Sequence, residues 1–390
     1  MSAQVAAVRA AFEGEVALLY ASKANGHPDV LATLEPLVDG VDVTSAGALR
    51  AAREAGFAGA AVQWTSPGKS RDDLALAVRT GATVVLGGVD EAEDLVDVAR
   101  AVGGGDGDVG ALPVTVRVNP KERIHAFRSV TGGVPSPFGI PEEELGEALA
   151  RMRDLGLRPR GIHVHRGSQC TSASAWLRHG TSTLDLLDRL VREEGLPPWA
   201  NLGGGLGVAV EGEQLDLASL GRRMAAAVRR FRQAHPQAAF TIEPGRYLVS
   251  EAGTLWLTVL RRREVRGTVF LVLDGGIDVF LFATERMRHG APPPMEVVRA
   301  GASRWAEVAG RAEAAEERSR GGVSPNDPGP TELVTLVGPA CTAEDTLARD
   351  VPLPRAEPGD RIVIHNAGAY AARASITGFL GRGLARESVV

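Results

Sequence analysis

The chain has 390 residues, a length that suggests two domains, and its composition of 44% hydrophobic and 23% charged residues is typical of a globular protein. Its net charge of −5 gives no basic surface for nucleic acid or an anionic membrane, and no apolar run is long enough to span a bilayer. The first residues lack the pattern of a signal peptide, and two cysteines do not make a disulfide framework. We therefore expect a reduced, cytoplasmic protein.

Short β-rich runs alternate with helical patterns over residues 16–250, which predicts an α/β fold of the TIM-like (β/α)8 barrel type. The predicted strands are Val16–Tyr20, Val41–Val43, Ala60–Gln63, Thr83–Leu86, Val114–Val118, Gly161–His165, Trp199–Leu202 and Phe240–Glu243. The predicted helices are Ala46–Ala55, Arg71–Arg79, Ala92–Val102, Pro141–Leu155, Ala175–Arg192 and Leu217–Ala234.

Residues 251–390 have a different pattern, in which strand-like runs follow one another without regular helices. These runs are Leu255–Arg261, Val265–Leu273, Leu333–Val337 and Arg361–His365. They predict a separate β-sandwich or β-barrel domain. The segment 311–330 is rich in Ala, Glu, Arg, Gly and Pro, and we expect a flexible, exposed excursion there.

Lys23 stands where the first predicted strand ends, in a chain that has only three lysines among its 43 basic residues. Arginine cannot form an imine, whereas lysine forms Schiff bases with carbonyl groups. A lysine that extends along a strand end to solvent is the simpler alternative.

Three further strands end in polar or glycine-rich sequence, where a TIM-like barrel places its chemistry. His163 and His165 lie on one face of a predicted strand. A metal site there lacks a third ligand at a recognisable spacing, and a ring that stacks on a planar cofactor is the better interpretation. The run Asn201–Gly207 places glycines before a helix, where backbone N–H groups can bind phosphate. Glu243 ends the last strand, three residues before Arg246.

A lysine, a stacking ring, a phosphate-binding loop and a carboxylate together match the needs of pyridoxal 5'-phosphate. A carboxylate beside the pyridine nitrogen keeps that nitrogen protonated, so that the ring withdraws electrons strongly. This favours the loss of CO2 from an α-carbon. In the β domain, Cys341 lies in a turn with Glu344 and Asp345, and Tyr370 follows a glycine turn; alone, each is a weak signal.

In chain order these segments resemble the fold-type III pyridoxal-phosphate decarboxylases, and the diaminopimelate decarboxylase branch more than ornithine decarboxylase. The resemblance covers nearly the whole chain. The matching segments are Tyr20–Asn25, Asp42–Leu49, Arg117–Pro120, Thr131-Gly132, Phe138–Ile140, His163–Gln169, Asn201–Gly207, Glu243–Arg246, Gly338–Asp345 and Ala367–Tyr370.

The resemblance implies a role for each matching residue. Lys23 would bind the cofactor as a Schiff base, His165 would stack on its ring, and Glu243 would face the pyridine nitrogen. The phosphate would be bound by Ser168, Gly203, Gly204, Gly205 and Tyr370. Arg246 would bind the phosphate or a substrate carboxylate. Cys341 would act near the α-carbon of a partner subunit's substrate, so a homodimer with shared sites is implied. The resemblance also places residues 1–15 in the β domain.

The chain differs from the family at the positions that would contact the far end of the substrate. Thr342 follows Cys341 in place of an acid, Ala48 and Pro137 replace a Glu and a Lys, and no Arg occurs in Asp274–Phe282. A site that lacks a charged partner rejects a charged substrate. We therefore predict a specialised biosynthetic substrate, such as a conjugated or carrier-bound amino acid. The candidate substrate-binding residues are Arg246, Thr342, Glu344, Asp345, Arg286 and Arg288.

Three alternatives remain open from the sequence. The first is a true diaminopimelate, ornithine or lysine decarboxylase. The second is an amino-acid racemase on the same fold, which Glu243 disfavours because racemases place an Arg near the pyridine nitrogen. The third is a cofactor-binding homologue without turnover, which the presence of Lys23, Glu243 and Cys341 disfavours.

Overall fold

The structure is a computed structural model that describes residues 1–103, 109–209, 214–288, 291–300 and 331–389. The chain divides into two compact units, Met1–Ser250 and Glu251–Ser388, which are described separately. The expected excursion at 311–330 lies outside the described residues. Within the described ranges, no helix combines the length and the apolar character that crossing a membrane requires.

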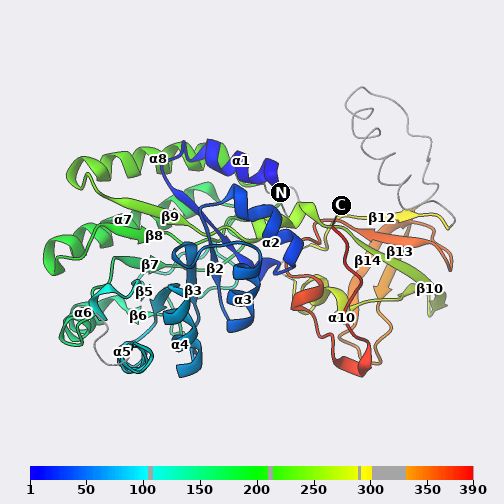
Figure 1. The fold of residues 1–390 in the computed structure, drawn as a ribbon. Helices are drawn as coiled ribbons and strands as arrows, with labels where there is room; N and C mark the ends of the chain where they lie inside the picture. The colour runs from blue at the N-terminus through cyan, green and yellow to red at the C-terminus, as the bar shows by residue number, and fades with distance from the viewer. Residues whose placement is uncertain (104–108, 210–213, 289–290, 301–330, 390) are drawn as a thin grey trace. The chain divides into compact units, whose positions relative to one another are not determined.

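Eight parallel strands close into a barrel in the first unit, as predicted (Figure 1). Their order around the barrel is β4-β3-β2-β1-β9-β8-β7-β5, and pairing of β4 with β5 closes the ring. A short strand, β6 (Ile140–Pro141), adds beside β5. The barrel strands are β1 (Ala17–Ala21), β2 (Gly40–Val43), β3 (Val62–Thr65), β4 (Thr83–Leu86), β5 (Val114–Asn119), β7 (Ile162–Val164), β8 (Trp199–Asn201) and β9 (Ala239–Ile242).

Helices cover the outside of the barrel (Figure 1), so the strands are buried on both faces and read as almost continuous apolar runs. Side-chain caps define where several helices begin: Ser70 and Asp73 form a capping box at α4, and Asp216 caps α8. The helices are α2 (Pro28–Leu34), α3 (Ala46–Glu54), α4 (Arg71–Thr80), α5 (Val89–Val102), α6 (Leu145–Asp154), α7 (Ala173–Glu194), α8 (Leu217–Ala234) and α9 (Arg246–Val249).

The first residues do not join the β domain, which corrects the expectation for residues 1–15. They form helix α1 (Ser2–Ala11), which belongs to the barrel unit and packs on α8. Val5, Val8 and Phe12 are buried, and the spacing of these apolar residues gives the helix one apolar face. Gly221 of α8 allows the close approach, because a Cβ there would lie 2.4 Å from the carbonyl of Ala11.

Among its described residues, the second unit contains a six-stranded sheet in the order β12-β15-β10-β11-β13-β14, in which β11 and β13 pair in parallel and the other neighbours antiparallel. Leu255–Thr258 of β10 pairs with β15, whereas Val259–Val265 pairs with β11, so β10 links two halves of the sheet. The elements are β10 (Leu255–Val265), β11 (Thr268–Leu273), α10 (Ile277–Phe280), β12 (Met295–Val298), β13 (Thr331–Val337), β14 (Thr346–Pro354) and β15 (Arg361–Ile364).

Candidate active site

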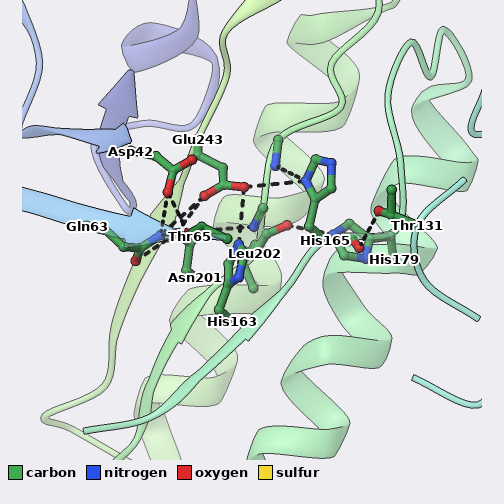
Figure 2. Close-up of polar contacts among 12 residues, drawn as sticks. Asp42, Gln63, Thr65, Thr131, His163, His165, His179, Asn201, Leu202 and Glu243 are labelled. Carbon is green, nitrogen blue, oxygen red and sulfur yellow. Dashed lines mark hydrogen bonds and ion pairs between the residues drawn. The ribbon is translucent and has the colours of Figure 1, made fainter. Parts of the chain in front are cut away.

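Glu243 is the centre of a buried polar network at the carboxyl ends of the barrel strands (Figure 2). It follows β9 directly, and the residue is 3% exposed. Its Oε1 accepts a hydrogen bond from Nε2 of His163 at 3.1 Å. Its Oε2 accepts from Nδ2 of Asn201 at 3.1 Å and from Nε2 of Gln63 at 3.4 Å. Three strands besides β9 therefore support one carboxylate.

The charge of Glu243 is stabilised although it is buried. Burial by itself would raise the pKa of this carboxyl, but the contact with His163 and the charge of nearby Lys23 outweigh that effect and hold the pKa well below its usual range. Glu243 is therefore an anion at neutral pH. A buried anion of this kind can face a protonated ring nitrogen.

His165 lies beside Glu243, with its Nδ1 atom 3.4 Å from Oε1 of Glu243. The same Nδ1 accepts a hydrogen bond from the backbone N–H of Gly204 at 3.2 Å, so the ring proton is on Nε2. Burial, together with the charge of Lys23, lowers the pKa of His165 well below its ordinary value. The result is a neutral, oriented ring whose side chain is 12% exposed.

Lys23 occupies the 3-10 turn η1 (Ser22–Ala24) directly after β1. The strand before it is buried, as the sequence indicated, but Lys23 itself is exposed. The turn is fixed by Ser22, whose hydroxyl donates to the carbonyl of Asp42 at 2.8 Å. Lys23 is close enough to the network for its charge to lower the pKa values of both Asp42 and Glu243.

The glycine run packs tightly against the network, which explains why larger residues are excluded. Gly203 and Gly205 have φ values of +70° and +86°, in the left-handed region that favours glycine. A Cβ on Gly204 would lie 2.4 Å from the carbonyl oxygen of Glu243, and one on Gly203 would lie 2.5 Å from that of Val164. The loop thus brings backbone N–H groups next to His165 and Glu243.

Two neighbouring candidates from the sequence lie at this end of the barrel. Ser168 is held in place by a backbone pair with Arg128, with both N–H to O distances at 2.8 Å. Arg246 begins α9, directly after Gly245. The donor set therefore fits pyridoxal phosphate: it holds an ionised carboxylate, a neutral aromatic ring, a lysine and a glycine loop suited to an anion.

Sequence reasoning missed three members of the network, which are Asp42, Gln63 and Thr65. Asp42 is fully buried, and its Oδ1 accepts from the Thr65 hydroxyl at 2.6 Å and from Gln63 Nε2 at 3.3 Å. The available signal was a polar side chain inside an apolar strand: Asp42 interrupts Gly40–Val43, and Gln63 and Thr65 alternate in Val62–Thr65. Residues two apart in a strand face the same side, here the barrel interior.

The remaining candidates lie in the second unit, in two segments. Cys341 is an exposed free thiol. The carboxylate of Asp345 is committed to the fold, because it accepts 2.7 Å hydrogen bonds from the backbone N–H groups of Ile277 and Ala340. Thr342 donates its hydroxyl proton to Glu344, which also pairs with Arg286 at 2.9 Å. Asp345 thus fixes the turn that presents Cys341 and Thr342.

Arg288 and Tyr370 are also anchored within this unit. Arg288 donates to the carbonyl of Leu347 at 2.6 Å, and burial lowers its pKa. Tyr370 has a φ of +55°, and its ring centroid lies 5.8 Å from that of Phe282.

Comparison with known families agrees with this geometry. Residues 1–250 match the family described as "Pyridoxal-dependent decarboxylase, pyridoxal binding domain". Residues 246–368 match "Pyridoxal-dependent decarboxylase, C-terminal sheet domain". The chain therefore belongs to the pyridoxal-dependent decarboxylases, a family of carboxy-lyases, and its cofactor is pyridoxal phosphate.

Its relatives include two kinds of decarboxylase. The chain is 32% identical to the L-glutamyl-[BtrI acyl-carrier protein] decarboxylase of Niallia circulans, over 88% of this chain and 75% of the relative. It is 30% identical to the diaminopimelate decarboxylase of Deinococcus radiodurans, over 93% of this chain and 81% of the relative.

Solved structures share the fold. The diaminopimelate decarboxylase of Helicobacter pylori, complexed with L-lysine, has a TM-score of 0.78 at 22% identity, covering 98% of this chain and 88% of the other. The diaminopimelate decarboxylase of M. jannaschii, also in complex with L-lysine, has a TM-score of 0.80 at 21% identity, covering 97% of this chain and 82% of the other.

Proposed function

We propose that this enzyme removes the α-carboxylate, as CO2, from an amino acid whose far end is joined to a carrier rather than left as a free charged group. The observation that carries the proposal is the 32% identity to a decarboxylase named for a glutamate bound to an acyl-carrier protein. Free diaminopimelate is the competing substrate, since other relatives at similar identity are named for it.

The pocket residues support the conjugate. No Arg or Lys occurs in Asp274–Phe282, and the residue after Cys341 is Thr342 in place of an acid. Glu344 lies two residues after Thr342, but its carboxylate already pairs with Arg286. Arg286 is likewise engaged by Glu344, and Arg288 by the carbonyl of Leu347. A distal carboxylate or ammonium would therefore enter without the partner that its desolvation requires, whereas an amide or thioester needs none.

We assign the following roles in the barrel. Lys23 would hold the cofactor through its amine. His165 would lie against the cofactor ring, and the Glu243 carboxylate would keep the pyridine nitrogen protonated. Ser168 and Gly203–Gly205 would bind the phosphate, with Arg246 beside them. When bound, the cofactor takes up the electron pair that remains on the α-carbon as CO2 leaves.

The second unit supplies the remaining roles in this proposal. We infer that Cys341 reaches the active site of a partner subunit and, with Lys23, returns a proton to the α-carbon. Tyr370 reaches the phosphate, and Thr342, Asp345, Arg286 and Arg288 lie around the substrate's far end. The exposed thiol of Cys341 is consistent with completion of the site in a homodimer. A free thiol also fits a reducing compartment, so we place the enzyme in the cytoplasm.

The proposal is tested by CO2 release from the enzyme loaded with pyridoxal phosphate. The panel contains L-glutamate attached to an acyl-carrier protein, free L-glutamate, meso-diaminopimelate, lysine, ornithine and arginine. The Lys23→Arg variant is the blank, because it keeps the charge but cannot form the imine. We expect turnover of the carrier-bound amino acid and little of the free ones. Efficient turnover of free diaminopimelate would contradict the substrate assignment.

A further inference from the structure

Two buried acids of the barrel share one amide nitrogen. Nε2 of Gln63 lies 3.3 Å from Oδ1 of Asp42 and 3.4 Å from Oε2 of Glu243. All three residues are at most 3% exposed. An amide NH2 has two hydrogens, so Gln63 can donate one to each acid.

The orientation of this amide is set from the glycine loop. The backbone N–H of Gly203 donates to Oδ1 of Asn201 at 2.8 Å, so Nδ2 of Asn201 must point the other way. That nitrogen donates to Oε1 of Gln63 at 3.2 Å and to Oε2 of Glu243 at 3.1 Å. The oxygen of Gln63 is thus occupied as an acceptor, and its nitrogen faces the two acids (Figure 2).

The two acids receive unequal support. Glu243 accepts hydrogen bonds on both oxygens, from three side chains. Asp42 accepts only on Oδ1, while its buried Oδ2 has no hydrogen-bond partner among the residues that the structure describes. A buried charge with few donors is costly, and two neighbouring carboxylates disfavour ionisation of both. The negative charge therefore resides on Glu243, and the proton on Asp42.

We propose that Asp42 is a neutral carboxylic acid at neutral pH, and that Gln63 is a positioning residue that couples it to the ionised Glu243. The inference rests on the proposed role of Glu243 and not on the choice of substrate. As a consequence, Asp42 gains or loses its proton when the charge in the barrel mouth changes. Glu243 then keeps the charge that the ring nitrogen needs.

The groups that act on Asp42 come from strands β3 and β5, the turn η1 and the loops that follow β3 and β9. Burial and then Glu243 raise the pKa of Asp42 to about 7, whereas Lys23, Thr65 and Gln63 oppose the shift. Two further cations interact with it, Lys69 after β3 and Arg117 on β5. Because these cations and donors only partly offset burial and Glu243, Asp42 keeps its proton well above the ordinary carboxyl range and titrates in the neutral range.

The test is an infrared pH titration of the holoenzyme, which detects the carbonyl stretch of a protonated carboxylic acid. The wild type should show this band near neutral pH, and Asp42→Asn should lose it. In Glu243→Gln the band should disappear at a lower pH, by about one unit or more, because the neighbouring negative charge is gone. In Gln63→Met it should persist to a higher pH, because the ionised form of Asp42 loses a donor.

The band should therefore shift to lower pH in one variant and to higher pH in the other. A purely structural role of Gln63 and Glu243 would not produce these opposite shifts. A band that persists unchanged in Asp42→Asn would overturn the proposal. An identical titration in wild type, Glu243→Gln and Gln63→Met would also overturn it. This second comparison tests the proposal even when the Asp42→Asn variant does not fold. The band is read without substrate, so failure of the carrier-bound assignment would leave this result intact.

Discussion

Nε2 of His163 lies 3.1 Å from Oε1 of Glu243, and both residues are almost fully closed off from solvent. Because Glu243 is ionised, His163 must donate from Nε2, and its buried Nδ1 then has no partner within the described ranges. Burial also lowers the pKa of His163, so the ring is a neutral donor. The carboxylate is therefore supported mainly by oriented dipoles rather than by a second full charge in contact with it.

Replacement of Glu243 by Gln should separate cofactor binding from turnover. The glutamine keeps the shape, but it cannot hold a proton on a ring nitrogen as an anion does. We expect bound chromophore to be retained and kcat to fall by about 100-fold or more, as for other losses of oriented electrostatic stabilisation. The measurement is steady-state CO2 release at matched cofactor occupancy. A kcat within a few-fold of wild type would show that Glu243 does not act on the ring.

Acid should destabilise the fold through Glu243. Its pKa in the folded protein is depressed below the ordinary 4.5, so the folded state binds fewer protons than the unfolded state as pH falls. Its contribution to stability is present above about pH 4.5 and is lost as the pH drops through the folded value. The free energy of unfolding should therefore fall more steeply below pH 4.5 in wild type than in Glu243→Gln. Parallel pH profiles of the two proteins would contradict this.

The glycine loop should not tolerate a methyl group at Gly204. A Cβ there would lie 2.4 Å from the Glu243 carbonyl oxygen, so Gly204→Ala should cost about 1–3 kcal/mol and weaken cofactor binding. Gly68→Ala is the matched control, because it lies in an exposed loop where a Cβ meets nothing within 4 Å. Thermal unfolding and cofactor titration of both variants test this. Equal effects from the two substitutions would mean that close packing of the loop is unimportant.

Lys69 should be a structural lysine, in contrast to Lys23. Its Nζ donates to the carbonyls of Ser66 and Val85, both at 2.8 Å, and to Glu91 at 2.7 Å. Its side chain is fully buried, so Lys69→Met should leave Glu91 without its buried partner and cost about 3–5 kcal/mol. Chemical denaturation gives the value, with Lys121→Met on an exposed site as control. A loss of less than 1 kcal/mol would contradict the assignment.

Cys341→Ala should retain the chromophore but lose most CO2 release. If the site is shared between subunits, mixing it with inactive Lys23→Ala should restore activity, because one mixed site then contains both intact residues. The assay compares each variant alone with the refolded or co-expressed mixture. Absence of any recovery, with mixed dimers demonstrated, would place Cys341 in its own subunit's site or outside catalysis.

The sequence was sufficient to predict the barrel, because strands buried on both faces are short apolar runs separated by amphipathic helices. Thr83–Leu86 was predicted with its observed bounds, whereas β3 lies two residues later than predicted. Strands β12 and β14 were missed because they lack a clear apolar alternation: β12 is only partly buried and β14 contains Arg349 and Asp350.

The candidate site was predicted only where a residue type pointed to chemistry by itself. Lys23, His165 and Glu243 end strands and are reactive or charged, so their positions indicated a shared barrel mouth. Gln63 was missed because its role depends on a hydrogen bond to Glu243, which is 180 residues away in the chain. Barrel closure brings such residues together, and no local pattern records that contact.

The most direct test of the account compares one amino acid in two forms, L-glutamate attached to an acyl-carrier protein and free L-glutamate, with meso-diaminopimelate as a third substrate. The kcat/KM for CO2 release is measured for each, with Lys23→Arg as the blank. The account predicts a kcat/KM for the carrier-bound form at least about 100-fold above those for both free amino acids, the scale expected when a buried charge lacks its partner. A higher value for meso-diaminopimelate than for the carrier-bound form would contradict it.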